Sequence, residues 1–184
     1  VYNATDSRLS AVPSVLTGTK GVSYGFSPDL SDHFPDDDSL YTKGPREHPR
    51  QLYYSLYSAS DSVCEIASGT QRLKLDRSHL PGWHNALNLV AVYALIAELF
   101  GKQEPQLFTG LKPPYGRGEA IKVGGSKLTL QLVKNPNGFR TAMNVEPSKP
   151  ALIVINDLIA DGRDVSWLWD VDVSSLGERQ SVSV

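Results

Sequence analysis

The chain has little cysteine, little net charge and no long apolar run. Cys64 is the one cysteine among 184 residues, which excludes an internal disulfide and a cysteine-rich zinc site. The net charge is −2 and the basic residues form no stripe, so the positive surface that nucleic acid requires is missing. No apolar run approaches the ~20 residues of a membrane-spanning helix. We therefore expect no nucleic acid partner and no membrane span.

Two motifs of large enzyme classes are missing as well. The stretches "TGTKG" at 17–21 and "GGSK" at 124–127 lack the Lys-Ser/Thr pair of a phosphate-binding loop. No G-x-S-x-G sequence occurs, which excludes the nucleophile elbow of an α/β-hydrolase. Cys64 stands in no nucleophile motif, and we interpret it as a structural residue.

The clearest element in the sequence is a helix at 84–101. Its apolar residues recur at helical spacing and predict a mostly buried helix. Gly101 stands where a left-handed glycine ends many helices. The apolar positions are Leu87, Val90, Ala91, Ala94, Leu95 and Phe100.

Short strands are expected before this helix. Two strand-like runs lie around 11–16 and 21–26. A hairpin is predicted within 51–68, and a further strand at 70–78. Between them, residues 27–50 are rich in Pro, Asp and Ser, so we expect an exposed loop that buries little apolar surface.

The pattern after the helix predicts a strand, a helix and a strand. The alternating run "KLTLQLV" at 127–133 is typical of a strand, and residues 135–146 begin with a turn and continue as a helix. The continuous apolar run at 150–157 predicts a buried strand of a parallel sheet. This order is that of a right-handed crossover unit, with a domain boundary near 102–112.

Three polar side chains at the start of the predicted helix form a first candidate site. His84, Asn85 and Asn88 fall on one side of its first turn. Amide side chains there would read the edge of a purine, and helix N–H groups favour phosphate. The alternative is that Asn85 caps the helix and His84 lies on the surface.

A second candidate site follows the last two strands of the chain. "KNPNGF" at 134–139 would form either an anion site at Lys134 or a tight turn. The loop after 150–157 is rich in both carboxylates and tryptophan, and ligands gather beyond the carboxyl ends of parallel strands. This loop forms either a functional site or a self-stabilised surface loop. Its tryptophans would either anchor the end of the loop to the protein or be buried against a partner chain. Its notable residues are Asn156, Asp157, Asp161, Asp164, Trp167 and Trp169.

Several of these motifs resemble a known family. "PGWHNALNLVAVYAL" at 81–95 is similar to the PG-x-HN-x-x-N-x-x-A helix of Mur ligases, and "YNATDSRL" at 2–9 resembles their NADDP segment. "GRGE" at 116–119, "KNPNGF" and "INDLIADGRDVSWLWDVDV" at 155–173 resemble the C-terminal domain of the MurT family, the Mur-ligase-like subunits of lipid II isoglutaminyl synthase. The resemblance covers about residues 1–26 and 80–184.

The resemblance implies an α/β fold in two parts. Residues 1–104 would be a partial Mur ligase central domain with an irregular insertion at about 27–79. Residues 105–184 would be an incomplete MurT-type C-terminal domain of Rossmann-like architecture. The family's phosphate-binding loop would precede Val1, and a further helix would follow the C-terminal strand, so we expect a chain truncated at both ends and inactive alone.

The resemblance also implies an activity, cofactors and partners. MurT uses ATP with Mg²⁺ to activate the D-glutamate α-carboxylate of lipid II in the cytoplasm, and ammonia from a GatD-type glutamine amidotransferase gives D-isoglutamine. His84, Asn85 and Asn88 would contact adenine. An aspartate, ranked Asp161, then Asp157 and Asp164, would complete the partner's Cys-His pair.

Departures from the family leave other interpretations open. The family's zinc ribbon has four cysteines, whereas this chain has only Cys64, so we do not expect zinc. The chain would alternatively be a non-catalytic docking module for the glutaminase. A third interpretation is another Mur-like amide ligase that acts on a different acid, such as a folate precursor.

Overall fold

The structure is a computed structural model in two compact units, Val1–Pro114 and Tyr115–Val184. We expected the division after residue 104. It falls later because Phe108 is buried in the core of the first unit and holds the following segment there. The residues that the structure describes are 1–9, 12–15, 17–34, 48–49, 51–101, 104–146, 148–155, 165–171 and 173.

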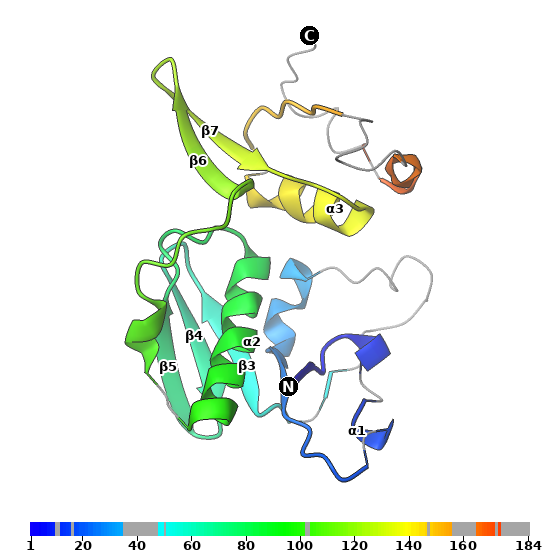
Figure 1. Ribbon diagram of the computed structural model, residues 1–184, viewed down its shortest axis with the longest axis vertical. Helices are drawn as coiled ribbons and strands as arrows, with labels where there is room; N and C mark the ends of the chain where they lie inside the picture. Colours follow the sequence, from blue (N-terminus) through cyan, green and yellow to red (C-terminus); the bar gives the residue numbers. More distant parts are fainter. Residues whose placement is uncertain are drawn as a thin grey trace. The chain divides into compact units, whose positions relative to one another are not determined.

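A five-stranded mixed sheet forms the centre of the first unit (Figure 1). Its strands lie side by side in chain order. The first three run parallel, and the last three form an antiparallel meander. The second strand confirms the prediction around 21–26. The strands are β1 (Tyr2–Asn3), β2 (Ser23–Phe26), β3 (Tyr54–Ala59), β4 (Val63–Ser68) and β5 (Gln71–Asp76).

The meander β3–β4–β5 has a buried face because apolar residues alternate along its strands. Leu56 of β3 and Cys64 and Ile66 of β4 are completely buried. The predicted hairpin and the strand after it are therefore confirmed. Residues 54–76 are a regular part of the sheet and differ from the irregular insertion that we expected over about 27–79.

The helix α2 (Trp83–Phe100) packs on one face of this sheet (Figure 1). Gly101 ends it in the left-handed conformation, with φ of 64°, and donates its N–H to the Ala97 carbonyl at 2.9 Å. The predicted helix and its glycine cap are thus confirmed. The buried side chains of α2 are Ala86, Leu89, Val90, Tyr93, Ala94 and Ala97.

The outer stripe of α2 is exposed, so the prediction of a mostly buried helix is wrong. Leu95 and Phe100, which we expected in the core, are both exposed. A helix that packs on one sheet buries the stripe that faces it and leaves the opposite stripe outside. By length and composition alone α2 passes as a membrane span, but its inner stripe packs on the sheet as in a core helix.

A short helix, α1 (Val12–Val15), stands where we predicted a strand around 11–16. Pro13 has no N–H to donate to a sheet, and its fixed φ suits the first turn of a helix. Val15 is exposed, so the segment has no buried face that would hold it as a strand. The described 3-10 helices of this unit are η1 (Ser7–Leu9), η2 (Pro28–His33) and η4 (Pro105–Phe108).

The second unit begins with a two-stranded hairpin. β6 (Arg117–Val123) pairs antiparallel with β7 (Ser126–Gln131), which confirms the strand predicted at 127–133. Later in the unit, a 3-10 helix, η6 (Ser166–Asp170), follows the segment 156–164 that carries the three aspartates.

The helix α3 (Pro136–Val145) follows β7 and confirms the helix predicted from 135–146. Asn135 is its N-cap, since its Oδ1 accepts a hydrogen bond from the Gly138 N–H at 2.7 Å. Phe139 is buried and anchors the helix. "KNPNGF" is therefore the start of a capped helix, and Lys134 is exposed beside it.

The strand predicted at 150–157 is not formed by its described residues. Ala151 to Ile155 have no regular secondary structure, and Leu152, Val154 and Ile155 are exposed. A buried parallel strand needs neighbours on its edges and cover on its faces. The described part of this unit offers an antiparallel hairpin, one α-helix and the short 3-10 helix η6. The α/β class is confirmed, whereas the Rossmann-like crossover is absent from the described residues.

Candidate functional site

One edge of the five-stranded sheet collects the candidate residues of the first unit. β1, β2 and β3 are parallel, so their carboxyl ends lie at the same edge. β4 reverses the direction and β5 restores it, so β5 also ends at this edge and α2 begins there. Ligands of open α/β sheets bind at such an edge, beyond the carboxyl ends of the strands.

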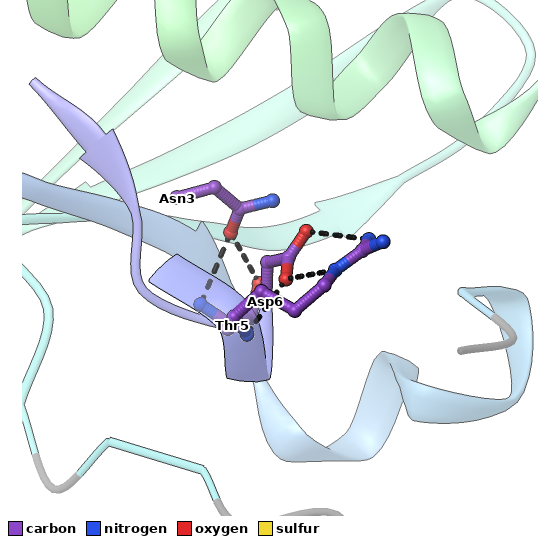
Figure 2. A network of polar contacts seen from close by, with 4 residues as sticks. Asn3, Thr5 and Asp6 are labelled. Carbon is purple, nitrogen blue, oxygen red and sulfur yellow. Dashed lines mark hydrogen bonds and ion pairs between the residues drawn. The ribbon is translucent and has the colours of Figure 1, made fainter. Parts of the chain in front are cut away.

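The exit of β1 is held by a small polar network (Figure 2). The Thr5 N–H and hydroxyl both donate to Asn3 Oδ1, at 3.0 and 2.7 Å. The Arg8 guanidinium binds both carboxylate oxygens of Asp6, each at 3.1 Å. The "NATDSR" motif thus closes on itself as a turn after the strand, and Asp6 is paired within the motif.

The start of α2 differs from the cap that we considered. Its N-cap residue is Gly82, which has no side chain, so the interpretation of Asn85 as the cap is wrong. The Asn85 Nδ2 instead donates back to the Pro81 carbonyl at 2.6 Å. Asn88 is exposed one turn further along.

His84 is largely shielded rather than a surface residue. Burial, followed by the charge of Arg77, lowers the pKa of His84 from its ordinary 6.5. The imidazole is therefore neutral at pH 7 and presents one nitrogen as donor and one as acceptor. A neutral ring at the start of α2 suits recognition of an uncharged, hydrogen-bonding group such as a base edge.

An aromatic cluster at the same edge was missed from the sequence. The His33 imidazole stacks on the Trp83 indole, with ring centroids 3.7 Å apart and planes inclined by 10°. Phe34 stacks on Phe26 and meets the Trp83 ring edge to face. His33 and Phe34 lie in a segment that we expected to be an exposed loop. The one indication of this cluster in the sequence was Trp83, a large aromatic residue directly before the "HN" pair.

Asp76, at the end of β5, was also missed. Its carboxylate accepts hydrogen bonds from the Ser78 N–H and hydroxyl and from the Gly110 N–H. These bonds, the one from the Ser78 hydroxyl first, lower the pKa of Asp76 from 3.8 to about 2. The residue ties the end of the sheet to the segment that leaves the first unit.

The predicted catalytic carboxylates, Asp157, Asp161 and Asp164, lie outside the described residues, as does Asn156. The structure does describe residues 165–171, which follow this loop. Trp167 is half-buried, whereas Trp169 is 91% exposed. An exposed indole favours burial of Trp169 against a partner chain over a role as internal anchor.

The described residues offer no ready metal site. Within them, no three His, Cys, Asp or Glu side chains stand close enough to hold an ion. Cys64 is buried, and burial raises the pKa of its thiol to about 11. The thiol is therefore protonated at neutral pH, in keeping with a structural role.

Comparison with known proteins confirms the resemblance. Residues 132–184 match the family described as MurT ligase C-terminal, and this match includes the aspartate loop. The subunit MurT of lipid II isoglutaminyl synthase (glutamine-hydrolyzing) from Staphylococcus aureus, strains COL and N315, is 33% identical over 108 residues.

A further relative comes from another organism. The subunit MurT of Streptococcus pneumoniae (strain ATCC BAA-255 / R6) is 28% identical over 125 residues, which cover 62% of this chain. The Staphylococcus matches cover 55% of this chain. The chain spans about a quarter of the length of these relatives, 24% and 28% respectively. The chain is thus similar to part of a synthase subunit.

Proposed function

We propose that this chain is part of a MurT-type subunit that amidates the D-glutamate α-carboxylate of lipid II to D-isoglutamine. The match of residues 132–184 to the MurT ligase C-terminal family carries the proposal, since this segment holds the loop with three aspartates. The relatives are named as subunits of a glutamine-hydrolysing synthase, which supports glutamine as the nitrogen source. In this proposal ammonia comes from a GatD-type glutaminase, and the reaction takes place in the cytoplasm at the inner membrane face.

The edge at the start of α2 is proposed to bind the adenine of ATP. Asn85 donates its Nδ2 to Pro81, and its Oδ1 acceptor suits the adenine amino group. The neutral ring of His84 and the exposed Asn88 would bind beside it. ATP, when bound with Mg²⁺, supplies the phosphoryl group that turns a carboxylate into an electrophile. No residue of this chain is assigned to Mg²⁺, and we expect no stoichiometric zinc in the purified protein.

The aspartate loop is proposed to act on the partner. A carboxylate that accepts the N–H of an imidazole fixes the tautomer and orientation that a Cys-His pair needs. Asp161 is the first candidate, followed by Asp157 and Asp164. The residue acts as the third member of a triad whose other two members belong to the glutaminase.

Single aspartate-to-asparagine variants in the full-length protein, purified with its glutaminase, test this role. At one of the three positions glutaminase turnover should fall by roughly 100-fold or more while the complex still forms. Asp170→Asn, in the neighbouring η6, is the matched control and should keep normal turnover. Wild-type turnover in all three variants would remove the triad assignment.

A docking module is the second candidate function, and the exposure of Trp169 favours it. In that case Trp169→Ala weakens association, and turnover falls only in proportion to the complex lost. Titration of the glutaminase against each variant separates the two functions, because a saturating partner restores turnover to a docking variant and leaves a triad variant inactive.

The nucleotide assignment has a separate test. Asn85→Ala should raise the KM for ATP about tenfold, the cost of roughly one hydrogen bond to the base. Asn137→Ala, at an exposed position of α3, is the control. An unchanged KM in the Asn85 variant would remove the adenine assignment and leave the amidation proposal to the aspartate tests.

A further inference from the structure

The turn between β5 and α2 has three successive carbonyls that are bound from within the fold. The Arg77 Nε and Nη2 donate to Leu80 O at 3.3 and 3.2 Å, and Nη2 also donates to Gly82 O at 2.8 Å. The Pro81 carbonyl between them accepts the Asn85 Nδ2. Every carbonyl of the 80–82 turn therefore has a side-chain donor.

Arg77 is unusual because its charge is buried. The residue is 5% exposed, and within the described part of the chain no carboxylate forms an ion pair with it. A buried guanidinium is costly unless its N–H groups are bonded. Here the carbonyls of Leu80 and Gly82 perform that task, so the charge and the turn stabilise each other.

The same turn sets the direction in which α2 starts. Gly82 has a φ of 87°, a backbone conformation that residues other than glycine rarely adopt. Its carbonyl also accepts the Asn85 N–H at 3.2 Å, the first hydrogen bond of the helix. Arg77 therefore touches the carbonyl from which the first turn of α2 is built.

We propose that Arg77 is a positioning residue, which acts through the Leu80 and Gly82 carbonyls to hold His84 and Asn85 in place for a ligand. That this ligand is the adenine of ATP rests on the function proposed above. Two nitrogens of the rigid, planar guanidinium make three contacts with these carbonyls, Nη2 binding both of them. A lysine ammonium keeps the charge and has three donors, but all three sit on one strongly hydrated nitrogen at the end of a flexible stem, so it does not hold the two carbonyls in the same fixed geometry.

The test compares Arg77→Lys and Arg77→Met in the full-length protein. Arg72, on β5, is exposed and lies over the Tyr57 ring, so Arg72→Lys and Arg72→Met are matched controls. Ile66→Val, which removes one methylene from the core of β4, controls for a general loss of stability.

The kinetic readout separates positioning from catalysis. Arg77→Lys should raise the KM for ATP about tenfold and leave kcat within about twofold, since binding geometry changes and the reacting groups do not. The three control variants should keep the KM of the wild type. An Arg77→Lys protein with a wild-type KM, in an enzyme whose wild type uses ATP, overturns the proposal.

A second readout does not depend on ATP. NMR titration of the His84 imidazole should show a higher pKa in Arg77→Met, because a neighbouring positive charge has been removed, and a smaller change in Arg77→Lys. If the wild type does not use ATP, the proposed function fails and Arg77→Lys decides the inference, because it keeps the charge and changes the contacts with the carbonyls: the amide resonances of residues 82–85 and the His84 titration should both change. Wild-type amide resonances and an unchanged His84 titration in Arg77→Lys overturn it. Should Arg77→Met not fold, the lysine variant still gives both readouts.

Discussion

The Asp76 carboxylate accepts a hydrogen bond of 3.0 Å from the Gly110 N–H, although the two residues lie 34 positions apart in the sequence. Phe108, two residues before Gly110, is buried, and the centroid of its ring lies 5.9 Å from that of the Tyr93 ring of α2. The segment that leaves the first unit is thus fastened to both β5 and α2. Residues 111–114, which follow Gly110, have no regular secondary structure.

This contact predicts a specific acid sensitivity. The pKa of Asp76 is lowered to about 2, so its stabilising contribution is complete above the ordinary value of 3.8 and is lost as the pH falls through about 2. Urea unfolding of wild type and Asp76→Asn between pH 5 and pH 2 should therefore converge as the pH falls. Asp32→Asn, at an exposed position of η2, is the control. Parallel curves for wild type and Asp76→Asn would show that the contact does not form.

Close packing at Gly25 gives a second prediction. A Cβ on Gly25 would lie 2.5 Å from the Thr5 Cγ2 and 3.0 Å from its hydroxyl oxygen. Thr5 is buried and bound to Asn3, so it cannot turn aside. Gly25→Ala should destabilise the protein by about 1–3 kcal/mol in thermal unfolding.

Two variants test the cause of that effect. Gly21→Ala meets its nearest atom at 3.4 Å, an ordinary contact, and should cost much less. Adding Thr5→Ser to Gly25→Ala removes the clashing methyl group and keeps the hydroxyl, so part of the stability should return. A Gly25→Ala protein that melts with the wild type would contradict the close contact.

The cap of α3 gives a third prediction. Asn135→Ala removes the acceptor of the Gly138 N–H and should cost the second unit about 1 kcal/mol. Asn137→Ala, two positions further along and exposed, should leave stability nearly unchanged. Amide hydrogen exchange across 137–139 reports the loss directly, and equal exchange in the two variants would speak against the cap.

The apolar run after α3 supplies a fourth prediction. Val154 is 80% exposed, so Val154→Thr should change the free energy of unfolding by less than about 0.5 kcal/mol. A buried strand, as the sequence suggested, would lose more than about 1 kcal/mol on the same change, since a hydroxyl enters a core. Chemical denaturation distinguishes the two outcomes. Phe139→Ala, at a buried position, gives for comparison the free energy of unfolding that is lost when a core side chain is removed.

The elements that were predicted correctly are those whose signal is local. α2 has helical periodicity and a glycine in the left-handed region after it, and α3 has an Asn-Pro start that caps a helix. The meander alternates apolar and polar residues at the spacing of a strand. Each of these patterns depends on residues a few positions apart, so the sequence alone contains the necessary information.

The errors and omissions have two sources: partners that are distant in the sequence, and local alternatives such as Pro13 in α1 and Gly82 at the start of α2. The outer stripe of α2 and residues 151–155 are apolar, but burial depends on what lies beside them in space. The same holds for the site, because "HN" at the start of α2 was recognisable whereas His33 and Arg77 were not. The role of His33 follows from its contact with Trp83, far along the chain, and that of Arg77 from the carbonyls of the nearby 80–82 turn. The residue types alone indicate neither contact.

The order of pairing within the five-stranded sheet has a consequence for how the first unit folds. β3, β4 and β5 are joined by short turns, so their contacts close small loops, whereas β1 and β2 reach their places only across longer ones. We therefore expect assembly to start in the meander and to finish with the two-residue β1. Pulse-labelled refolding should protect the amides of Ile66 and Leu75 before that of Ala4, which makes the opening residues of the chain the last to gain structure and the first to be released.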